Sequence, residues 1–78
     1  MFQLDAPAAS AAARRARFDA FRDAAACAVA HARQHGEAQV RYRSSGLLVA
    51  DFVRNDDRTV SVFAAGADGR ALVEGWAS

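Results

Sequence analysis

The spacing of apolar residues changes at Gly36, and the two halves of the chain predict different secondary structure. Residues 8–35 contain no glycine, and the single proline, Pro7, comes directly before them. Proline is tolerated at the entrance of a helix, and glycine is the preferred left-handed residue after its last turn. Larger apolar residues then recur at intervals of three and four, the spacing of one helix face. The members of this stripe are Phe18, Phe21, Ala25, Ala28, Val29 and Ala32. We therefore predict one helix over residues 8–35, with the stripe facing the core.

After Gly36 the apolar period becomes two, which is the spacing of a strand with one buried face. Every second residue from Ala38 to Tyr42 is apolar, and Ser44-Ser45-Gly46 is typical of a hairpin loop with glycine in the left-handed position. A three-residue loop predicts the apolar pairs Ala38–Phe52, Val40–Ala50 and Tyr42–Leu48.

Two further turn signals divide the rest of the chain into strands. Asn55-Asp56-Asp57-Arg58 precedes a strand over residues 59–64, and Asp68-Gly69 is a strong hairpin signal before residues 70–76. We therefore predict a third strand and a fourth, all antiparallel.

The faces of the predicted sheet are unequally covered. The turn at residues 55–58 is compatible with two registers, which place Val60 and Val62 on opposite faces of the sheet. We place both on the inner face. The outer face then carries an apolar excess, and contiguous patches beyond roughly a few hundred Å² mark interaction surfaces. The residues that we assign to this interface are Leu47, Val49, Val53, Phe63, Leu72 and Trp76, together with Arg41 and Arg43.

These elements define an α+β fold in which one N-terminal α-helix packs on a three- or four-stranded antiparallel β-meander. The 78 residues fit a single domain, with an arm over residues 1–7, the helix over 8–35 and the sheet over 37–76. One helix covers one face of the sheet, so we expect a second copy, in a two-fold dimer, or a protein target to cover the other. A strongly twisted sheet, or the arm Met1-Phe2-Gln3-Leu4 folded over that face, would cover it instead.

Composition narrows the class of partner and the compartment. The formal net charge is +1, which gives no support for binding a polyanion through bulk charge. Every basic residue is arginine, while lysine and isoleucine are absent, as in GC-rich bacterial or phage genomes. No apolar run approaches the ~18 residues of a membrane span. The single cysteine, Cys27, fits a reducing compartment, so we expect a cytoplasmic protein.

Candidate chemistry is sparse. Cys27, His31 and His35 follow each other at intervals of four, and neighbouring pairs offer ligands that suit zinc or copper. A tetrahedral site needs four ligands, and residues 27 and 35 are ~12 Å apart along a helix axis, so we expect neither a metal nor a cofactor. The carboxylates fall mainly in turns, and no third group orients a Cys–His pair. We therefore expect no enzymatic activity.

Nucleic acid is the alternative partner. Arg41 and Arg43 with Phe63 or Trp76 have the composition of a base-stacking platform, although Asp51 and Glu74 share that face. Arginine and tryptophan are also common anchors of protein interfaces, and the near-neutral charge favours protein. We therefore expect a small non-enzymatic protein-interaction module that self-associates or acts as an inhibitor or adaptor. RNA or single-stranded DNA binding through the same face is the alternative.

Overall fold

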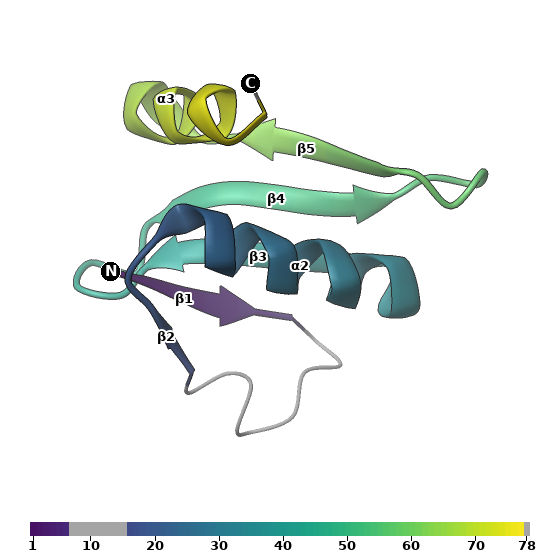
Figure 1. The fold of residues 1–78 in the computed structure, drawn as a ribbon, viewed down its shortest axis with the longest axis horizontal. Helices are drawn as coiled ribbons and strands as arrows, with labels where there is room; N and C mark the ends of the chain where they lie inside the picture. Colours follow the sequence, from purple (N-terminus) through teal and green to yellow (C-terminus); the bar gives the residue numbers. More distant parts are fainter. Residues whose placement is uncertain (7–15, 78) are drawn as a thin grey trace.

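A computed structural model describes residues 1–6 and 16–77. This part of the chain forms a five-stranded antiparallel sheet in the order β2-β1-β3-β4-β5 and two helices (Figure 1). The strands are β1 Phe2–Asp5, β2 Arg17–Phe18, β3 Glu37–Tyr42, β4 Leu48–Arg54 and β5 Val60–Ala64. The helices are α2 Phe21–His35 and α3 Gly66–Ala77. The α+β class and the antiparallel sheet are confirmed, but the order of the elements differs from the prediction.

The first helix is shorter than predicted. Arg17–Phe18 pairs with β1 as β2, with Phe18 opposite Phe2, and α2 begins only at Phe21. Apolar spacing could not reveal this, because Phe18 also fits the helical stripe. Residues 8–15 of the predicted helix, and Pro7 before them, lie outside the described residues. The predicted end is confirmed: Gly36 has φ +106°, and its N–H donates to the Ala32 carbonyl at 2.8 Å.

The N-terminal arm is a strand of the sheet and does not fold over its outer face. β1 lies between β2 and β3, with Leu4 opposite Val40. Phe2 and Leu4 are buried, whereas Asp5 is exposed, so these few residues alternate as a strand does. The arm therefore contributes to the core on the inner face.

The first hairpin confirms two of the three predicted pairs, Ala38–Phe52 and Val40–Ala50. The third is wrong, because a bulge shifts the register and places Arg41 opposite Leu48. Gly46 has φ +74°, as predicted, but residues 43–46 form the loop, since the Tyr42 N–H donates to the Leu47 carbonyl at 2.9 Å. The bulge inserts Val49, which is fully buried.

The C-terminal segment is helix α3, so the strand predicted over residues 70–76 is wrong. Leu72, Val73 and Trp76 pack against the core, at the spacing of a helix face. Asp68-Gly69 forms no hairpin: Asp68 lies in the first turn of α3, and Gly69 lies against the backbone of Val49. A Cβ atom at Gly69 would clash with the Val49 carbonyl oxygen.

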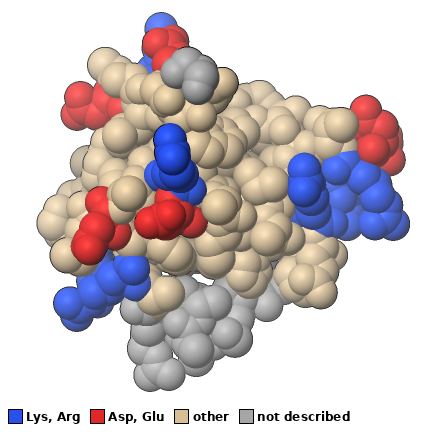
Figure 2. All heavy atoms as spheres, in the orientation of Figure 1, with Lys and Arg blue, Asp and Glu red and all other residues tan. Residues whose placement is uncertain are grey.

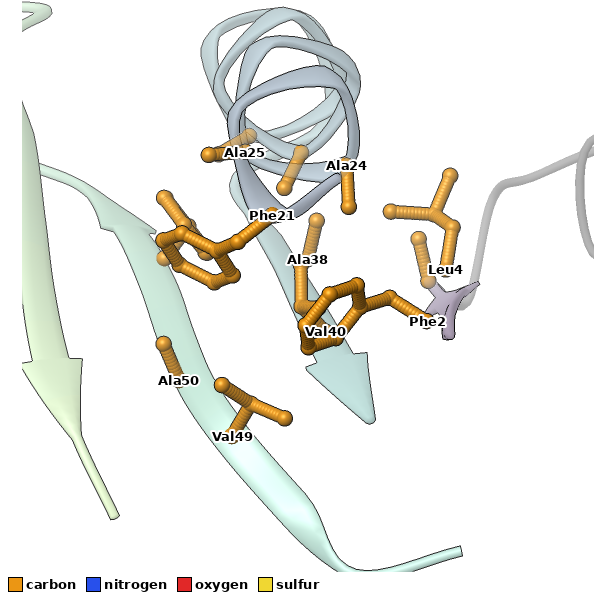
Figure 3. Close-up of a cluster of buried hydrophobic side chains, with 13 residues drawn as sticks. Phe2, Leu4, Phe21, Ala24, Ala25, Ala38, Val40, Val49 and Ala50 are labelled. Carbon is orange, nitrogen blue, oxygen red and sulfur yellow. The ribbon is translucent and has the colours of Figure 1, made fainter. Parts of the chain in front are cut away.

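The core lies between the helices and the inner face of the sheet. Figure 3 shows side chains of α2, β1, β3 and β4 converging there, among them Phe21 and Val40. Trp76 of α3 packs edge-to-face on Phe21 and Phe52, at ring distances of 6.1 and 5.9 Å. Val62 lies opposite Phe52, which confirms the inner-face placement of Val60 and Val62. Both helices thus cover the same face.

Candidate protein-interaction site

The six apolar residues predicted to form the outer-face patch do not lie together. Val49 is fully buried on the inner side, and Leu72 and Trp76 belong to α3, where they pack against the core. The remaining three are Leu47, 66% exposed directly after the hairpin loop, Phe63, 59% exposed on the outer face, and the half-buried Val53. The apolar excess on this face is therefore much smaller than the sequence predicts.

Polar side chains occupy the centre of the outer face. Arg41 donates from Nε to Asp5 Oδ2 at 3.2 Å, and its terminal nitrogens donate to Gln39 Oε1 and the Gly46 carbonyl, both at 2.9 Å. The Arg43 N–H donates to the Met1 carbonyl at 3.1 Å. These contacts hold β1, β3 and the hairpin loop together and suit a face in contact with water.

Two carboxyl groups meet on the same face. Asp51 lies opposite Gln39, two pairs along the ladder from Glu37 and Val53. A shared hydrogen bond with Asp51, and then repulsion between the two carboxyls, raise the pKa of Glu37. The Asp51 Oδ1 atom is buried and has no hydrogen-bond partner among the described residues. The pair adds negative charge to the outer face, which makes burial of this face under an apolar partner unfavourable.

A groove of about 650 Å³ opens on the inner side, between the C-terminal half of α2, β5 with the hairpin before it, and the end of α3. Its apolar wall consists of Val29, Val60, Val62 and Trp76. Arg33, Asp57, Arg58 and Thr59 form the polar part of its lining. The groove exists because α2 packs mainly over β3 and β4, while α3 packs over β4 and only part of β5. Val60 and Val62 consequently stay half-buried although they lie on the core face.

The β4–β5 hairpin holds one end of this groove in place. The Asn55 side-chain amide donates to Thr59 Oγ1 at 3.0 Å and to Ser61 Oγ at 2.8 Å. Hydrogen bonds from the Thr59 side chain and backbone lower the pKa of Asp57. Arg54 donates to the Arg33 carbonyl at 2.9 Å, which ties the hairpin to the end of α2. Figure 2 shows basic side chains, with acidic ones beside them, at the end of the molecule where this hairpin lies in Figure 1.

One side of β5 has no neighbour among the described strands, since β5 ends the sheet. The Asn55 N–H donates to the Thr59 carbonyl at 2.8 Å, and the Ala65 N–H donates to the Val49 carbonyl at 2.9 Å. Because antiparallel hydrogen bonds alternate, Ser61 and Phe63 bond toward β4, whereas the N–H and C=O groups of Val60 and Val62 point away from it. In Figure 1, α3 lies beside the C-terminal end of β5 only.

β5 also lacks the features that protect edge strands from pairing. Its sequence, Val60-Ser61-Val62-Phe63-Ala64, contains no charge and no proline. Natural edge strands are usually blocked by lysine, proline, bulges or a covering element. The sequence indicates this strand, but its exposure as an edge depends on α3 turning away, which the sequence prediction missed.

The residues considered for metal or thiol chemistry do not form a site. The rings of His31 and His35 lie 6.0 Å apart, and burial raises the pKa of the Cys27 thiol. Among residues 1–6 and 16–77, no three His, Cys, Asp or Glu side chains are placed to hold a metal ion. A raised thiol pKa lowers the fraction of reactive thiolate.

Only part of the predicted base-stacking platform lies on one face. Arg41, which is engaged with Asp5, and Phe63 both lie on the outer face, whereas Trp76 packs on Phe21 on the inner side.

Comparison with protein-family models, curated protein sequences and solved structures finds no match to this chain. Within the part of the chain that the structure describes, neither helix is long and apolar enough to span a membrane. The function is therefore inferred from the described residues themselves.

Proposed function

We propose that this protein is a small non-enzymatic interaction module that binds an extended segment of a polypeptide along β5. The observation that carries the proposal is an uncharged edge strand with an apolar groove on its inner side. An added strand would pair with the outward N–H and C=O groups of Val60 and Val62, the way in which sheet edges recognise peptides.

The groove supplies a basis for selecting side chains. Alternate residues of an added strand would project to the inner side, beside Val60, Val62 and the ring of Trp76. Arg33 and Arg58 line the same groove and suit an acidic or polar residue flanking the apolar ones. Two of the residues predicted for the interface thus lie at this edge, Phe63 in β5 on the outer face and Trp76 beside β5 on the inner side.

The size of the domain supports a role that includes a partner. A chain of this length buries only about 60–65% of its unfolded surface, which leaves a thin margin of stability. Burying Val60, Val62 and Phe63 under a bound segment would add to that margin, because a partner that binds only the folded state stabilises it. Self-association and action as an inhibitor or adaptor both fit this mode of binding. We rank RNA or single-stranded DNA binding second.

A phage-displayed library of random linear peptides tests the proposal. We expect enriched peptides to alternate apolar residues and, as synthetic ligands, to slow amide exchange at Val60 and Val62. Val62→Pro removes the N–H that points away from β4, and Val62→Ala shortens the same side chain while keeping that N–H. Binding should be about tenfold weaker or more for Val62→Pro than for Val62→Ala, since each 1.4 kcal/mol corresponds to tenfold. No enrichment, or equal binding by the two variants, would contradict the proposal.

A further inference from the structure

We infer that the segment bound by β5 is β5 of a second copy, so that the five described strands of each chain form one continuous antiparallel sheet about a two-fold axis at Val62. The inference rests on the proposed function and names the partner. Its first support is the hydrogen-bond pattern of the edge, since Val60, Val62 and Ala64 alternate outward. Placing the axis at Val62 pairs Val62 with itself and Val60 with the partner's Ala64, which uses every outward group of the strand.

The side chains of β5 are compatible with this self-pairing. No residue from Val60 to Ala64 is charged, so no like charges meet across the new pair. On the inner face, Val60 and Val62 would adjoin the partner's Ala64 and Val62, which extends the apolar wall of the groove. On the outer face, Phe63, 59% exposed, would lie opposite the partner's Ser61 and lose part of that exposure.

The interface is small, and this sets the expected strength. A stable interface buries about 800 Å² per partner, or about a sixth of the 4802 Å² surface of one chain. A five-residue strand edge with one aromatic contact buries less. We therefore expect a weak dimer, with dissociation in the micromolar range.

Sedimentation equilibrium of the full chain at increasing protein concentration tests the oligomeric state. The mass should rise toward twice that of the chain, and Val62→Pro should stay monomeric while Val62→Ala still dimerises. Amide exchange of the wild type adds a measurement that needs no variant. Protection of Val60, Val62 and Ala64 should increase with protein concentration, whereas Ser61 and Phe63, already bonded toward β4, should change little.

Disulfide trapping tests the register in a Cys27→Ser background. Ser61 and Phe63 of the two copies form a non-hydrogen-bonded pair in this register, in which Cα atoms lie ~4.5 Å apart, a distance that a disulfide spans. A mixture of Ser61→Cys and Phe63→Cys chains should give mainly the mixed dimer on oxidation. A predominance of Ser61→Cys homodimers would overturn the Val62 axis, and a dimer that persists in Val62→Pro would overturn pairing through β5.

Failure of the second-copy inference can be distinguished from failure of the proposed function. A monomer at all concentrations whose β5 still binds enriched peptides overturns the second-copy inference and leaves the proposed function standing. A monomer that binds no peptide contradicts both.

Discussion

Two parts of one sheet contain similar residues in different environments. Val40 and Val49, on β3 and β4, are fully buried, whereas Val60 and Val62, on β5, are half-buried on the same face. The difference arises from the cover: α2 and α3 meet over β4, where Trp76 contacts Phe21 and Phe52, and leave the outer half of β5 open. The covered strands stabilise the fold, and the uncovered strand is where a partner would bury the most additional apolar surface.

Phenylalanine offers the sharpest test of this difference. Phe52 is fully buried on β4, and Phe63 is 59% exposed on the neighbouring strand. Phe52→Ala should cost about 3–5 kcal/mol, comparable with the whole stability of a small domain, and leave the chain largely unfolded. Phe63→Ala should change stability by less than about 1 kcal/mol in the monomer. Urea titrations followed by circular dichroism measure both, and equal losses would mean that β5 is as well covered as β4.

Two of the three glycines of α3, Gly69 and Gly75, test how this helix is attached to the sheet. Gly69 lies against the Val49 carbonyl, whereas a Cβ at Gly75 meets nothing within 4 Å. Gly69→Ala should destabilise the protein by about 1–3 kcal/mol, because α3 must move away from β4. Gly75→Ala should be neutral or stabilise by up to about 1 kcal/mol through helix propensity. Thermal melts of the two variants measure the contrast, and a neutral Gly69→Ala would show that α3 does not need this close approach.

Local sequence patterns predicted α2, β3 and β4 better than they predicted the edge of the sheet at β5 and α3. The spacing of three and four predicted α2, the alternation after Gly36 predicted β3 and β4, and the two predicted pairs farthest from the hairpin loop are correct. The bulge at Val49 was not predictable, because it depends on how the loop closes its hydrogen bonds.

The candidate site was harder to predict, since it depends on long-range packing. Leu72, Val73 and Trp76 have helical spacing, but Asp68-Gly69 also matches a hairpin, and that reading placed Leu72 and Trp76 on the outer face. The role of Gly69 becomes visible only when β4 lies beside it. The groove beside β5 follows from where α2 and α3 lie on the sheet, which no local pattern specifies.

A substitution on the outer face of the covered strands should have the smallest effect on stability. The pKa of Glu37 is raised beside Asp51, so the folded chain holds this proton to a higher pH than the unfolded chain does. As pH rises from the ordinary glutamate pKa through the raised one, the unfolded state loses its proton first and stability falls. Glu37→Gln removes this titration, so the melting temperature of the variant relative to wild type should be higher at pH 7 than at pH 4. The shift should be small, because Glu37 is exposed to solvent.

Glu74→Gln, on an exposed position of α3, is the matched control for the loss of one carboxylate. Asp57, whose pKa is lowered by Thr59, titrates in the opposite sense, but it is present in all three proteins and cancels in the comparison. A Glu37→Gln variant with no gain at pH 7 would show that the two carboxyls do not oppose each other.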